Sequence, residues 1–467
     1  MKIRFGTDGW RAIIADGFTA DNVARVAEGT ALWLLKQYRY PEVVLGHDCR
    51  FAGQLFCEVI AKVMCSSGVK VHLGHGFVST PMVSLGTVQM EKHLGIIITA
   101  SHNPPDYNGF KLKGAFGGPL QPALVAEIES LIPEVCSIDF RNTDLSGFRD
   151  EGMLSQVDLE TMYCEHVKAH FDLDGIRNSG LKLAYDAMYG AGQNVLRRLL
   201  PDLTFLHCDY NPSFMGQAPE PIHKNLTEFS TLIKNRGDID SGLVTDGDAD
   251  RLGFYDNEGR FVDSHHIILL LIHYLYKYKG LSGKVCTAFS TTPRVEKLCR
   301  HYGLPTETVK IGFKYIAEIM VHEDVLLGGE ESGGIAIKGH IPERDGIWMG
   351  LTLWEFMAKS GKTLKGLIEE VYAITGPFSF ERNDLHLREE IKQRVLDKCR
   401  RGEFTSFGDY KVVRVDDLDG YKYFFENGDW LMIRASGTEP VLRTYAESST
   451  QQGAFAILDS AKEVILK

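Results

Sequence analysis

The sequence lacks any long hydrophobic run. Among its 467 residues there is no apolar stretch of roughly 18 residues, the length that begins to suggest a membrane span, and its most apolar segment, residues 267–272, is far too short. The chain begins Met1-Lys2-Ile3-Arg4, with no apolar signal region. We therefore expect neither a transmembrane segment nor a secretory signal.

An excess of positive charge is also lacking. Lysine and arginine number 51 against 62 aspartates and glutamates, which gives a formal net charge of −11. This balance argues against nucleic acid or a membrane surface as the main partner. An anionic substrate must then be bound by local basic residues, because the field of the whole protein would not attract it.

The nine cysteines include no C-x-x-C pair, and their odd number excludes complete intramolecular pairing. This usage is typical of reduced thiols, so we expect a cytoplasmic protein. No low-complexity segment interrupts the chain.

Short apolar runs alternate with helical patterns over most of the chain, which favours parallel α/β layers. After residue 375 the pattern changes to short strands with tight turns, followed by a helix at 452–466, which is typical of an α+β domain. The expected strands are 43–45, 69–73, 95–98, 181–185, 243–244, 284–288 and 325–327, and then 410–415, 421–426, 430–433 and 443–447.

The length suggests three or four domains. Polar or glycine-bearing breaks occur near residues 150, 257 and 375. We therefore expect an α/β protein with three similar domains, each with a mixed or parallel sheet, and a C-terminal α+β domain. The expected domains are 1–150, 151–256, 257–374 and 375–467.

A serine follows one of the expected buried strands. Leu94–Ile98 is short, apolar and β-branched, and Ser101 comes three residues later in Thr99-Ala100-Ser101-His102-Asn103. The two prolines at 104 and 105 prevent a helix from starting there. Ser101 should thus lie on a loop at the carboxyl end of a strand, where open α/β sheets bind ligands. An ordinary polar turn is the alternative.

Three carboxylates recur at every second position of another segment, Asp246, Asp248 and Asp250, with Arg251 directly after them. In an extended loop this spacing directs all three toward one side. Like charges so placed are costly without a cation, and Mg²⁺ fits oxygen ligands. An EF-hand is excluded, because its sixth position is glycine and its twelfth glutamate, whereas Arg251 and Asn257 stand here. A solvated acidic turn is the alternative.

Two further turns contain groups that suit a sugar phosphate. Gly328–Gly334 presents Glu330 and Ser332 among glycines, which suits recognition of sugar hydroxyls. Arg434–Pro440 lies between two strand-like segments and combines an arginine, two hydroxyls and a glycine backbone, a plausible phosphate cradle.

In this order the segments resemble the motifs of the α-D-phosphohexomutase family. The opening Phe5-Gly6-Thr7-Asp8-Gly9-Trp10-Arg11 is similar to the family's N-terminal signature. The resemblance covers essentially the whole chain, with motifs near residues 5, 100, 246, 330 and 435. It implies four domains around a central active-site cleft, each supplying one motif.

The resemblance also implies a reaction. Ser101 would be phosphorylated in the resting enzyme and pass its phosphoryl group to a hexose monophosphate, and the resulting bisphosphate would reorient and return the original phosphate. Asp246, Asp248 and Asp250 would hold Mg²⁺, with a phosphoserine oxygen of Ser101 as a further ligand. Glucose 1,6-bisphosphate would be the activator, and hexose phosphates the partners of a monomer or dimer.

Lys111 and His102 are alternatives for the general acid or base, and the sequence does not decide between them. The family favours Lys111, and a nearby cation, or burial, would lower the pKa of its amine toward a useful value. Arg11 and Arg251 would line the phosphoserine.

The resemblance assigns the substrate contacts. Glu330 and Ser332 would bind the sugar hydroxyls O3 and O4, and Lys314 lies in a Gly-Phe-Lys loop similar to that of phosphoglucomutases. The phosphate that does not react would be held by Arg434, Ser436, Gly437 and Thr438, whereas Arg443 either joins them or lies on a solvated strand face.

The prediction of the substrate rests on two features of the sequence. Dual glucose/mannose enzymes of the family often carry histidine where Gly334 stands, and Phe313 is typical of phosphoglucomutases. Both favour glucose phosphates, with a phosphomannomutase or phosphoglucosamine mutase as alternatives. A metal-dependent phosphatase and a silent sugar-phosphate sensor are alternatives of other classes.

Two polar segments stay open. In residues 338–346, Lys338, His340 and Arg344 either contact phosphate or lie in a solvated loop. Residues 47–50 follow a strand, and the family makes Asp48 and Arg50 mainly supporting residues.

Overall fold

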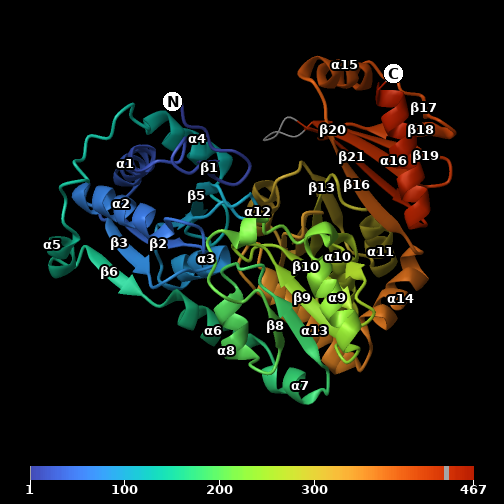
Figure 1. The fold of residues 1–467 in the computed structure, drawn as a ribbon, viewed down its shortest axis with the longest axis horizontal. Helices are drawn as coiled ribbons and strands as arrows, with labels where there is room; N and C mark the ends of the chain where they lie inside the picture. Colours follow the sequence, from blue (N-terminus) through green and yellow to red (C-terminus); the bar gives the residue numbers. More distant parts are fainter. Residues whose placement is uncertain (1, 436–440, 467) are drawn as a thin grey trace. The chain divides into compact units, whose positions relative to one another are not determined.

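The computed structural model describes residues 2–435 and 441–466, which form two compact units. The first unit comprises the chain up to residue 286 together with residues 312–368, and the second comprises residues 287–311 together with the chain from residue 369 onward. The polypeptide therefore passes between the units three times (Figure 1).

The first sheet of the first unit has six strands in the order β1-β5-β4-β2-β3-β6. Its strands are β1 (Trp10–Ile13), β2 (Glu42–His47), β3 (Lys70–Gly74), β4 (Leu94–Ile98), β5 (Tyr107–Gly114) and β6 (Leu154–Val157). Strands β2, β3, β4 and β6 run parallel, whereas β5 is antiparallel to both β4 and β1. The sheet is thus mixed, with the central strand β4 wholly buried.

Helices cover both faces of this sheet. They are α1 (Ala20–Gln37), α2 (Gly53–Ser66), α3 (Thr80–Gln89), α4 (Pro122–Leu131) and α5 (Leu145–Asp150). Leu45 and Ile96 belong to an apolar cluster that includes α1 and α2. On the opposite face, Val83 of α3 approaches so closely that a Cβ at Gly46 or Gly95 would lie 3.0 or 3.2 Å from it. This layering fits the expected α/β class.

The second sheet has the order β11-β10-β9-β7-β8 and is also mixed, with β7, β8 and β9 parallel and β10 antiparallel to β9 and β11. Its strands are β7 (Leu183–Asp186), β8 (Thr204–Leu206), β9 (Ser241–Thr245), β10 (Leu252–Asp256) and β11 (Phe261–Val262). The helices of this region are α6 (Leu159–His170), α7 (Leu173–Asn178), α8 (Gln193–Leu199) and α9 (Thr227–Arg236), with 3-10 turns at Phe214–Gly216 and His223–Asn225. The aspartate-rich segment connects β9 to β10.

The remainder of the first unit contains the antiparallel pair β14 (Val325–Gly329) and β15 (Ile335–Ile337), which the glycine-rich turn connects. The helices are α10 (Ser264–His273), which continues as a π-helix at Tyr274–Tyr278, α12 (Phe313–His322), α13 (Gly346–Ser360) and α14 (Leu364–Thr375), which runs into the second unit. Helix α13 packs against β9 and β10, which flank the aspartate-rich loop, and against α10, which in turn packs against β14 before the glycine-rich turn. The same helix therefore supports both segments.

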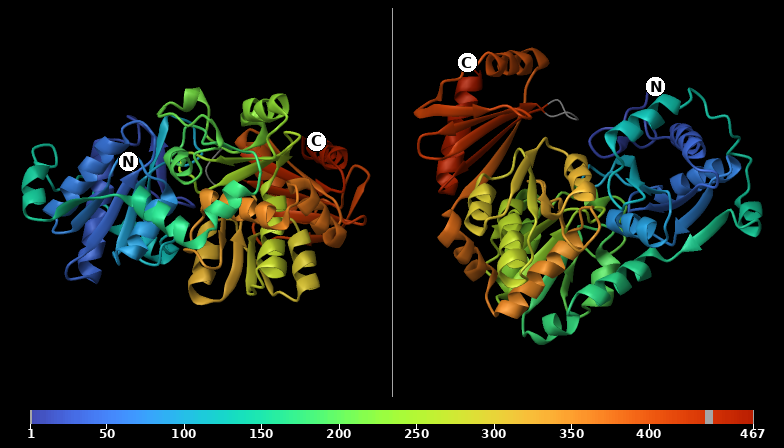
Figure 2. Two further views of the ribbon diagram at one scale, coloured as in Figure 1. Left: turned by 90° about the horizontal axis from the view of Figure 1, so that it is seen from below. Right: turned by 180° about the vertical axis from the view of Figure 1, so that it is seen from behind.

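The second unit is built on an antiparallel sheet in the order β16-β21-β20-β19-β18-β17. Its strands are β16 (Ser379–His386), β17 (Ser406–Phe407), β18 (Tyr410–Asp416), β19 (Tyr421–Phe425), β20 (Trp430–Ala435) and β21 (Val441–Ser448). Helix α16 (Gln451–Leu466) lies along one face of the sheet, and α15 (Glu389–Arg400) packs into the same core (Figure 2). The expected α+β character of this region is confirmed.

Residues 287–311 are held to this sheet by buried polar contacts. This segment of the chain includes the end of β12 (Lys284–Ala288), α11 (Arg294–Tyr302) and β13 (Thr306–Val309). The amine of Lys422 lies 3.9 Å from the ring centre of Trp430 and donates to the carbonyl oxygens of Phe289 and Thr291 at 3.2 and 2.9 Å. Arg294 pairs with Glu447 at 3.2 Å.

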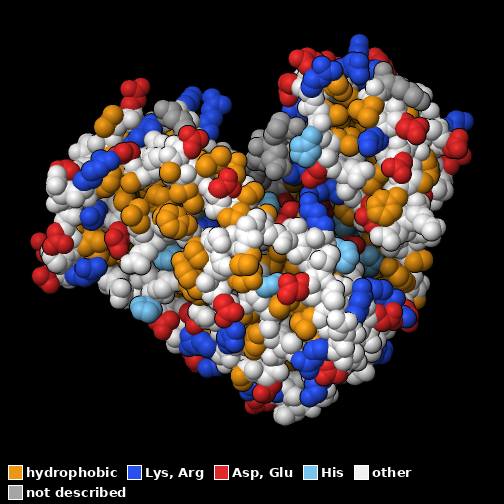
Figure 3. Space-filling model, in the orientation of Figure 1, with side chains coloured by type: hydrophobic (Ala, Val, Ile, Leu, Met, Phe, Trp, Pro, Cys, Tyr) orange, Lys and Arg blue, Asp and Glu red, His pale blue; other side chains and the backbone are white. Residues whose placement is uncertain are grey.

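On the face shown in Figure 3, acidic and basic side chains are interspersed over the surface. Among the residues that the structure describes, no helix combines the length and hydropathy needed to cross a membrane.

Candidate functional site

Ser101 lies in the turn that follows β4, and hydrogen bonds from the side chain of Arg50 hold the backbone of this turn. Its φ of 52° is left-handed, which few residues other than glycine adopt. The Nη2 of Arg50 donates to the carbonyl oxygens of Ser101 and Asn103, each at 2.6 Å, and Nη1 donates to that of Pro104 at 2.8 Å. Arg50 is itself buried beside Asp48. The turn therefore keeps a strained conformation because its surroundings determine it.

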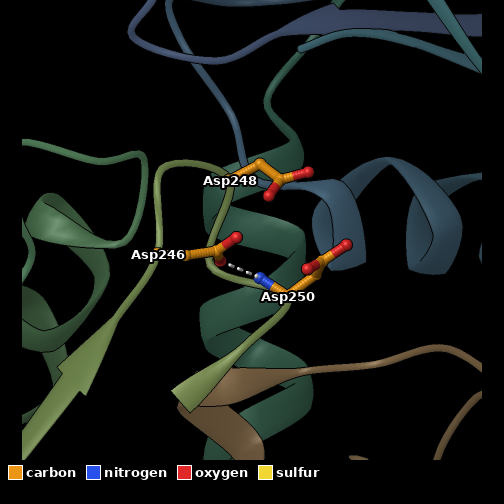
Figure 4. Close-up of side chains that lie close together, drawn as sticks. All are labelled: Asp246, Asp248 and Asp250. Carbon is orange, nitrogen blue, oxygen red and sulfur yellow. Dashed lines mark hydrogen bonds between the residues drawn. The ribbon is translucent and has the colours of Figure 1, made fainter. Parts of the chain in front are cut away.

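The three aspartates converge in the loop between β9 and β10 (Figure 4). All three are fully buried, and one oxygen of each lies within 4.8 Å of the others. The Oδ1 of Asp246 accepts hydrogen bonds from the backbone N–H groups of Asp250 and Arg251 at 3.0 and 3.1 Å, which curls the loop. Its Oδ2 accepts the Ser101 hydroxyl at 2.6 Å. The loop thus brings the serine onto the acidic cluster.

The acidic cluster fits a divalent cation. Among the described residues, Asp248 Oδ1 and Asp250 Oδ1 are buried without a hydrogen-bond partner. Burial, together with the charges of Asp248 and Asp250, raises the pKa of Asp246 well above its usual range. A cation would relieve this repulsion and satisfy both oxygens, and an all-oxygen set suits Mg²⁺. From outside, Thr80 Oγ1 donates to Asp248 Oδ2 at 2.5 Å and fixes its orientation.

Lys111 of β5 lies at the centre of the carboxylates. Its fully buried amine is 2.7 Å from Asp248, 3.1 Å from Asp250 and 2.9 Å from Asp8. Burial lowers the pKa of this amine, but the three carboxylates outweigh burial and raise the pKa above its usual range. The lowering expected from the sequence depends on burial and on a nearby cation, and of these two causes burial is present here but is outweighed by the carboxylates.

His102 lies beside the serine, with Nδ1 3.4 Å from Ser101 Oγ. Desolvation, and then the positive charges of Arg251 and Arg11, lower its pKa well below the usual range, so the imidazole is neutral at pH 7.

Two guanidinium groups flank the serine turn. Arg11 donates from Nη1 to Asn103 Oδ1 at 2.5 Å, and Arg251 Nε lies 3.9 Å from Asp250 Oδ1. They are close enough that, after burial, the charge of Arg251 helps to lower the pKa of Arg11. Two adjacent cations beside a serine hydroxyl suit a phosphoryl group.

The glycine-rich turn places Glu330 in the first unit's interior. Its carboxylate accepts the backbone N–H of Gly312 at 2.9 Å, and burial raises its pKa to about 7. Ser332 is half-buried in the same turn. Lys314, in the first turn of α12, lines a cavity of about 140 Å³ together with Thr7 and Asp8.

Asp8 was not predicted as a member of this site, and Arg344 was left open between a phosphate contact and a solvated loop. The Oδ2 of Asp8 meets both Lys111 and Nη2 of Arg344, at 2.9 and 2.5 Å, and Arg344 also lies 2.9 Å from Asp250. Arg344 is therefore buried rather than in a solvated loop. Asp8 lies inside the N-terminal signature, which was an available signal for its role. No such signal distinguishes Arg344 from Lys338 of the same polar segment, although Lys338 is paired with Asp324 at the surface.

The predicted phosphate cradle belongs to the second unit. Arg434 and Arg443 are directly opposite each other on β20 and β21. The Nε of Arg434 lies 3.3 Å from Asp419 Oδ1, and that of Arg443 lies 3.6 Å from Asp384 Oδ1. Ser436, Gly437 and Thr438 lie outside the described residues.

Comparison with known proteins finds one family throughout the chain. Four domain profiles match, described as phosphoglucomutase/phosphomannomutase alpha/beta/alpha domains I, II and III and C-terminal domain, at residues 2–137, 161–259, 263–374 and 390–463. A phosphoglucomutase/phosphomannomutase of Thermococcus kodakarensis is 29% identical, with 97% of this chain and 96% of that protein covered. A phosphoglucosamine mutase of Limosilactobacillus reuteri is also 29% identical with the same coverage. The crystal structure of a "putative phosphomannomutase" from Thermus thermophilus matches with a TM-score of 0.87 and 32% identity over all of both chains.

Proposed function

We propose, from the premise that this chain belongs to the phosphoglucomutase/phosphomannomutase family, that it interconverts hexose 1-phosphate and hexose 6-phosphate and that glucose phosphates are its preferred substrates. One observation carries the proposal. The hydroxyl of Ser101 lies 2.6 Å from Asp246, at the edge of a buried cluster of three carboxylates and beside two arginines. A serine so placed can carry a phosphoryl group and pass it on.

In the proposed reaction, the P–O bond to Ser101 Oγ breaks as a bond forms to the free hydroxyl of a hexose monophosphate. The proton of that hydroxyl goes to a base, and the serine oxygen is left to accept one. The bisphosphate reorients, and its original phosphate returns to Ser101 by the reverse chemistry. The phosphate therefore moves between C1 and C6 of the sugar.

Asp246, Asp248 and Asp250 would hold Mg²⁺ together with Ser101. When bound, the ion supplies positive charge that offsets the charge on the transferring group. Arg11 and Arg251 would bind the same group, and such preorganised charge provides most of phosphoryl-transfer catalysis.

Lys111 is our choice for the proton transfer, and His102 is the alternative. The amine of Lys111 touches two of the three metal-binding aspartates, so its protonation is coupled to the charge of that cluster. His102 is nearer to Ser101 in sequence and is already neutral, which suits a base. Retention of activity at pH 7 in His102→Gln, and its loss in Lys111→Gln, would support Lys111.

The substrate contacts are proposed from the family pattern. Glu330 and Ser332 bind the sugar hydroxyls, with Lys314 nearby, and the phosphate that does not react is held by a separate group. This group consists of Arg434, Ser436, Gly437, Thr438 and Arg443. Binding energy far from the reacting centre orients the sugar.

Preference for glucose over mannose is proposed from Phe313 and Gly334. Glucose and mannose differ only at C2, so the discrimination need not be large. Relatives carry the names phosphoglucomutase/phosphomannomutase and phosphoglucosamine mutase, so the amino sugar is the second candidate. We further propose the domains 1–150, 151–256, 257–374 and 375–467, a cytoplasmic monomer or dimer, and glucose 1,6-bisphosphate as activator.

The test is a coupled assay of glucose 1-phosphate, mannose 1-phosphate and glucosamine 1-phosphate with Mg²⁺ and a trace of the matching bisphosphate. We expect the glucose compound to be converted fastest. Comparable rates for mannose would make the enzyme dual-specific, and turnover of glucosamine alone would replace the substrate assignment. Accumulation of free phosphate in place of the isomer would indicate a phosphatase and overturn the proposal.

A further inference from the structure

Gly334 and Arg344 fit together closely. The side chain of Arg344 runs past the glycine-rich turn, and a Cβ at Gly334 would lie 2.5 Å from its Cδ and 3.0 Å from its Cγ. The φ of Gly334 is outside the left-handed range, so its backbone would accept an L side chain. The third nearest atom, Glu330 Oε2, would be at an ordinary 3.6 Å. Arg344 is thus the nearest obstacle to a side chain at position 334.

The guanidinium of Arg344 ends among groups of the site. Its Nη2 reaches Asp8 Oδ2 at 2.5 Å and Asp250 Oδ2 at 2.9 Å, and its carbon lies 5.3 Å from the ring centre of Phe313. Asp8 in turn contacts Lys111 at 2.9 Å. One side chain therefore touches a proposed metal ligand directly and the proposed general base through Asp8.

We propose that Arg344 is a positioning residue of this site, and that the glycine at 334 is required because Arg344 occupies the space of its side chain. The inference rests on the proposed function. Arg344 holds Asp250 in the orientation that leaves its Oδ1 free, and it keeps Asp8 on Lys111. Outer contacts of this kind orient metal ligands, and their removal typically costs about 10- to 100-fold in metal affinity or activity.

The pairing also bears on substrate choice. A side chain at this position, such as the histidine that dual glucose/mannose enzymes often carry, would meet Cδ and Cγ of Arg344, which would have to move. We therefore expect Gly334 to bear on substrate preference only in combination with Arg344. A change of substrate preference through this position requires substitution of both residues.

The first experiment uses Arg344→Gln and Arg344→Lys, with Arg236→Gln as the control, since Arg236 forms an exposed pair with Asp238. Mg²⁺ affinity is measured by calorimetry, and kcat and KM are measured with glucose 1-phosphate. For Arg344→Gln we expect a loss of about 10- to 100-fold in Mg²⁺ affinity or kcat, with KM for the sugar phosphate changed by less than about threefold. Arg344→Lys should recover to within about tenfold of wild type, because both contacts come from one nitrogen.

Wild-type Mg²⁺ affinity and kcat in Arg344→Gln would overturn the proposal. So would an effect confined to KM, since that would make Arg344 a substrate contact instead.

The second experiment tests the fit. Gly334→Ala, Arg344→Ala and the double variant are compared, with Gly147→Ala as a control because a Cβ there meets nothing within 4 Å. In the wild-type background, we expect Gly334→Ala to lower both the thermal midpoint and the Mg²⁺ affinity. Once Arg344 is alanine, the same substitution should change the thermal midpoint by no more than about one degree and the Mg²⁺ affinity by no more than about twofold. Additive effects would refute the pairing.

The thermal midpoints and Mg²⁺ calorimetry can be measured without a sugar substrate. If the wild-type protein converts no hexose phosphate while the two substitutions remain coupled, the proposed function fails and the pairing stands. If the wild type is an active mutase and the substitutions are independent, the pairing fails alone.

Discussion

The turn of Ser101 and the strands of Arg434 and Arg443 are both proposed to bind phosphate, yet they are built differently. Around Ser101, Lys111 and the three aspartates of the acidic cluster are fully buried, and the charged groups fix one another, as in the contacts of Lys111 with three carboxylates. In the second unit, the side chains of Arg434 and Asp419 are 18% and 25% exposed, and their ion pair has to compete with water. The comparison indicates that the proposed chemistry would take place in a preorganised interior, whereas the proposed remote phosphate would meet arginines that can exchange partners at little cost.

The largest effect should come from the serine. Ser101→Ala removes the group that is proposed to carry the phosphoryl, and we expect kcat to fall by at least about 1,000-fold, in line with loss of a nucleophile. Turnover and the phosphorylation state are measured by the coupled assay and by intact mass. Ser130→Ala, an exposed serine, is the control. Appreciable turnover in Ser101→Ala would remove the basis for the comparison.

The next effect concerns stability of the buried cluster. Lys111→Met leaves Asp248 without its cation and Asp250 with Arg344 alone, so the free energy of unfolding should fall by about 3–5 kcal/mol without metal. Mg²⁺ should restore part of it, because the ion binds the folded protein. Urea unfolding with and without Mg²⁺ measures both. Lys168→Met, which breaks an exposed pair with Glu165, should cost under about 0.5 kcal/mol.

The pKa of Glu330 gives a pH-dependent effect. Because burial raises this pKa to about 7 in the folded state, above the unfolded value near 4.5, protonated Glu330 stabilises the fold at low pH, and this stability is lost as pH rises through 7. Glu330→Gln should therefore gain stability relative to wild type between pH 5 and 8, by at most about 3 kcal/mol. A pH-independent difference in the free energy of unfolding would contradict the buried carboxyl.

The smallest effect on stability is expected from the second unit. Arg434→Gln should change the free energy of unfolding by no more than about 1 kcal/mol, since its ion pair is partly exposed. It should raise KM for the sugar phosphate by about tenfold, as loss of a charged phosphate contact would. The exposed Arg401→Gln is the control for both. A large loss of stability would show that the two regions are built alike.

The apolar strands and the polar turns after them could be read from the sequence. Leu94–Ile98 predicts β4 because a short, apolar, β-branched run is typical of a buried strand. The prolines that follow prevent a helix, which predicts the turn with Ser101. The convergence of the three aspartates was likewise predicted, but the prediction assumed an extended loop. The loop is curled, because Asp246 accepts the backbone N–H groups of Asp250 and Arg251.

The sequence did not predict strand β5, nor the contacts between residues that are far apart in the chain. Lys111 and Lys113 interrupt the apolar pattern of Tyr107–Gly114, yet both are buried because carboxylates from other segments surround them. Arg344 lies 336 positions from its partner Asp8, so no local pattern marks it. The three carboxylates that raise the pKa of Lys111 could not be counted from the sequence for the same reason, since their proximity depends on the fold.

The three crossings between the units bear on how this chain could be divided. A gene fragment that ended at residue 368 would encode residues 287–311 but not the strands that hold them. Phe289 and Thr291 would lose the amine of Lys422, and Arg294 would lose Glu447. The C-terminal region is consequently not a module that recombination could add or remove at a single junction, and a truncated coding sequence should yield an aggregation-prone product.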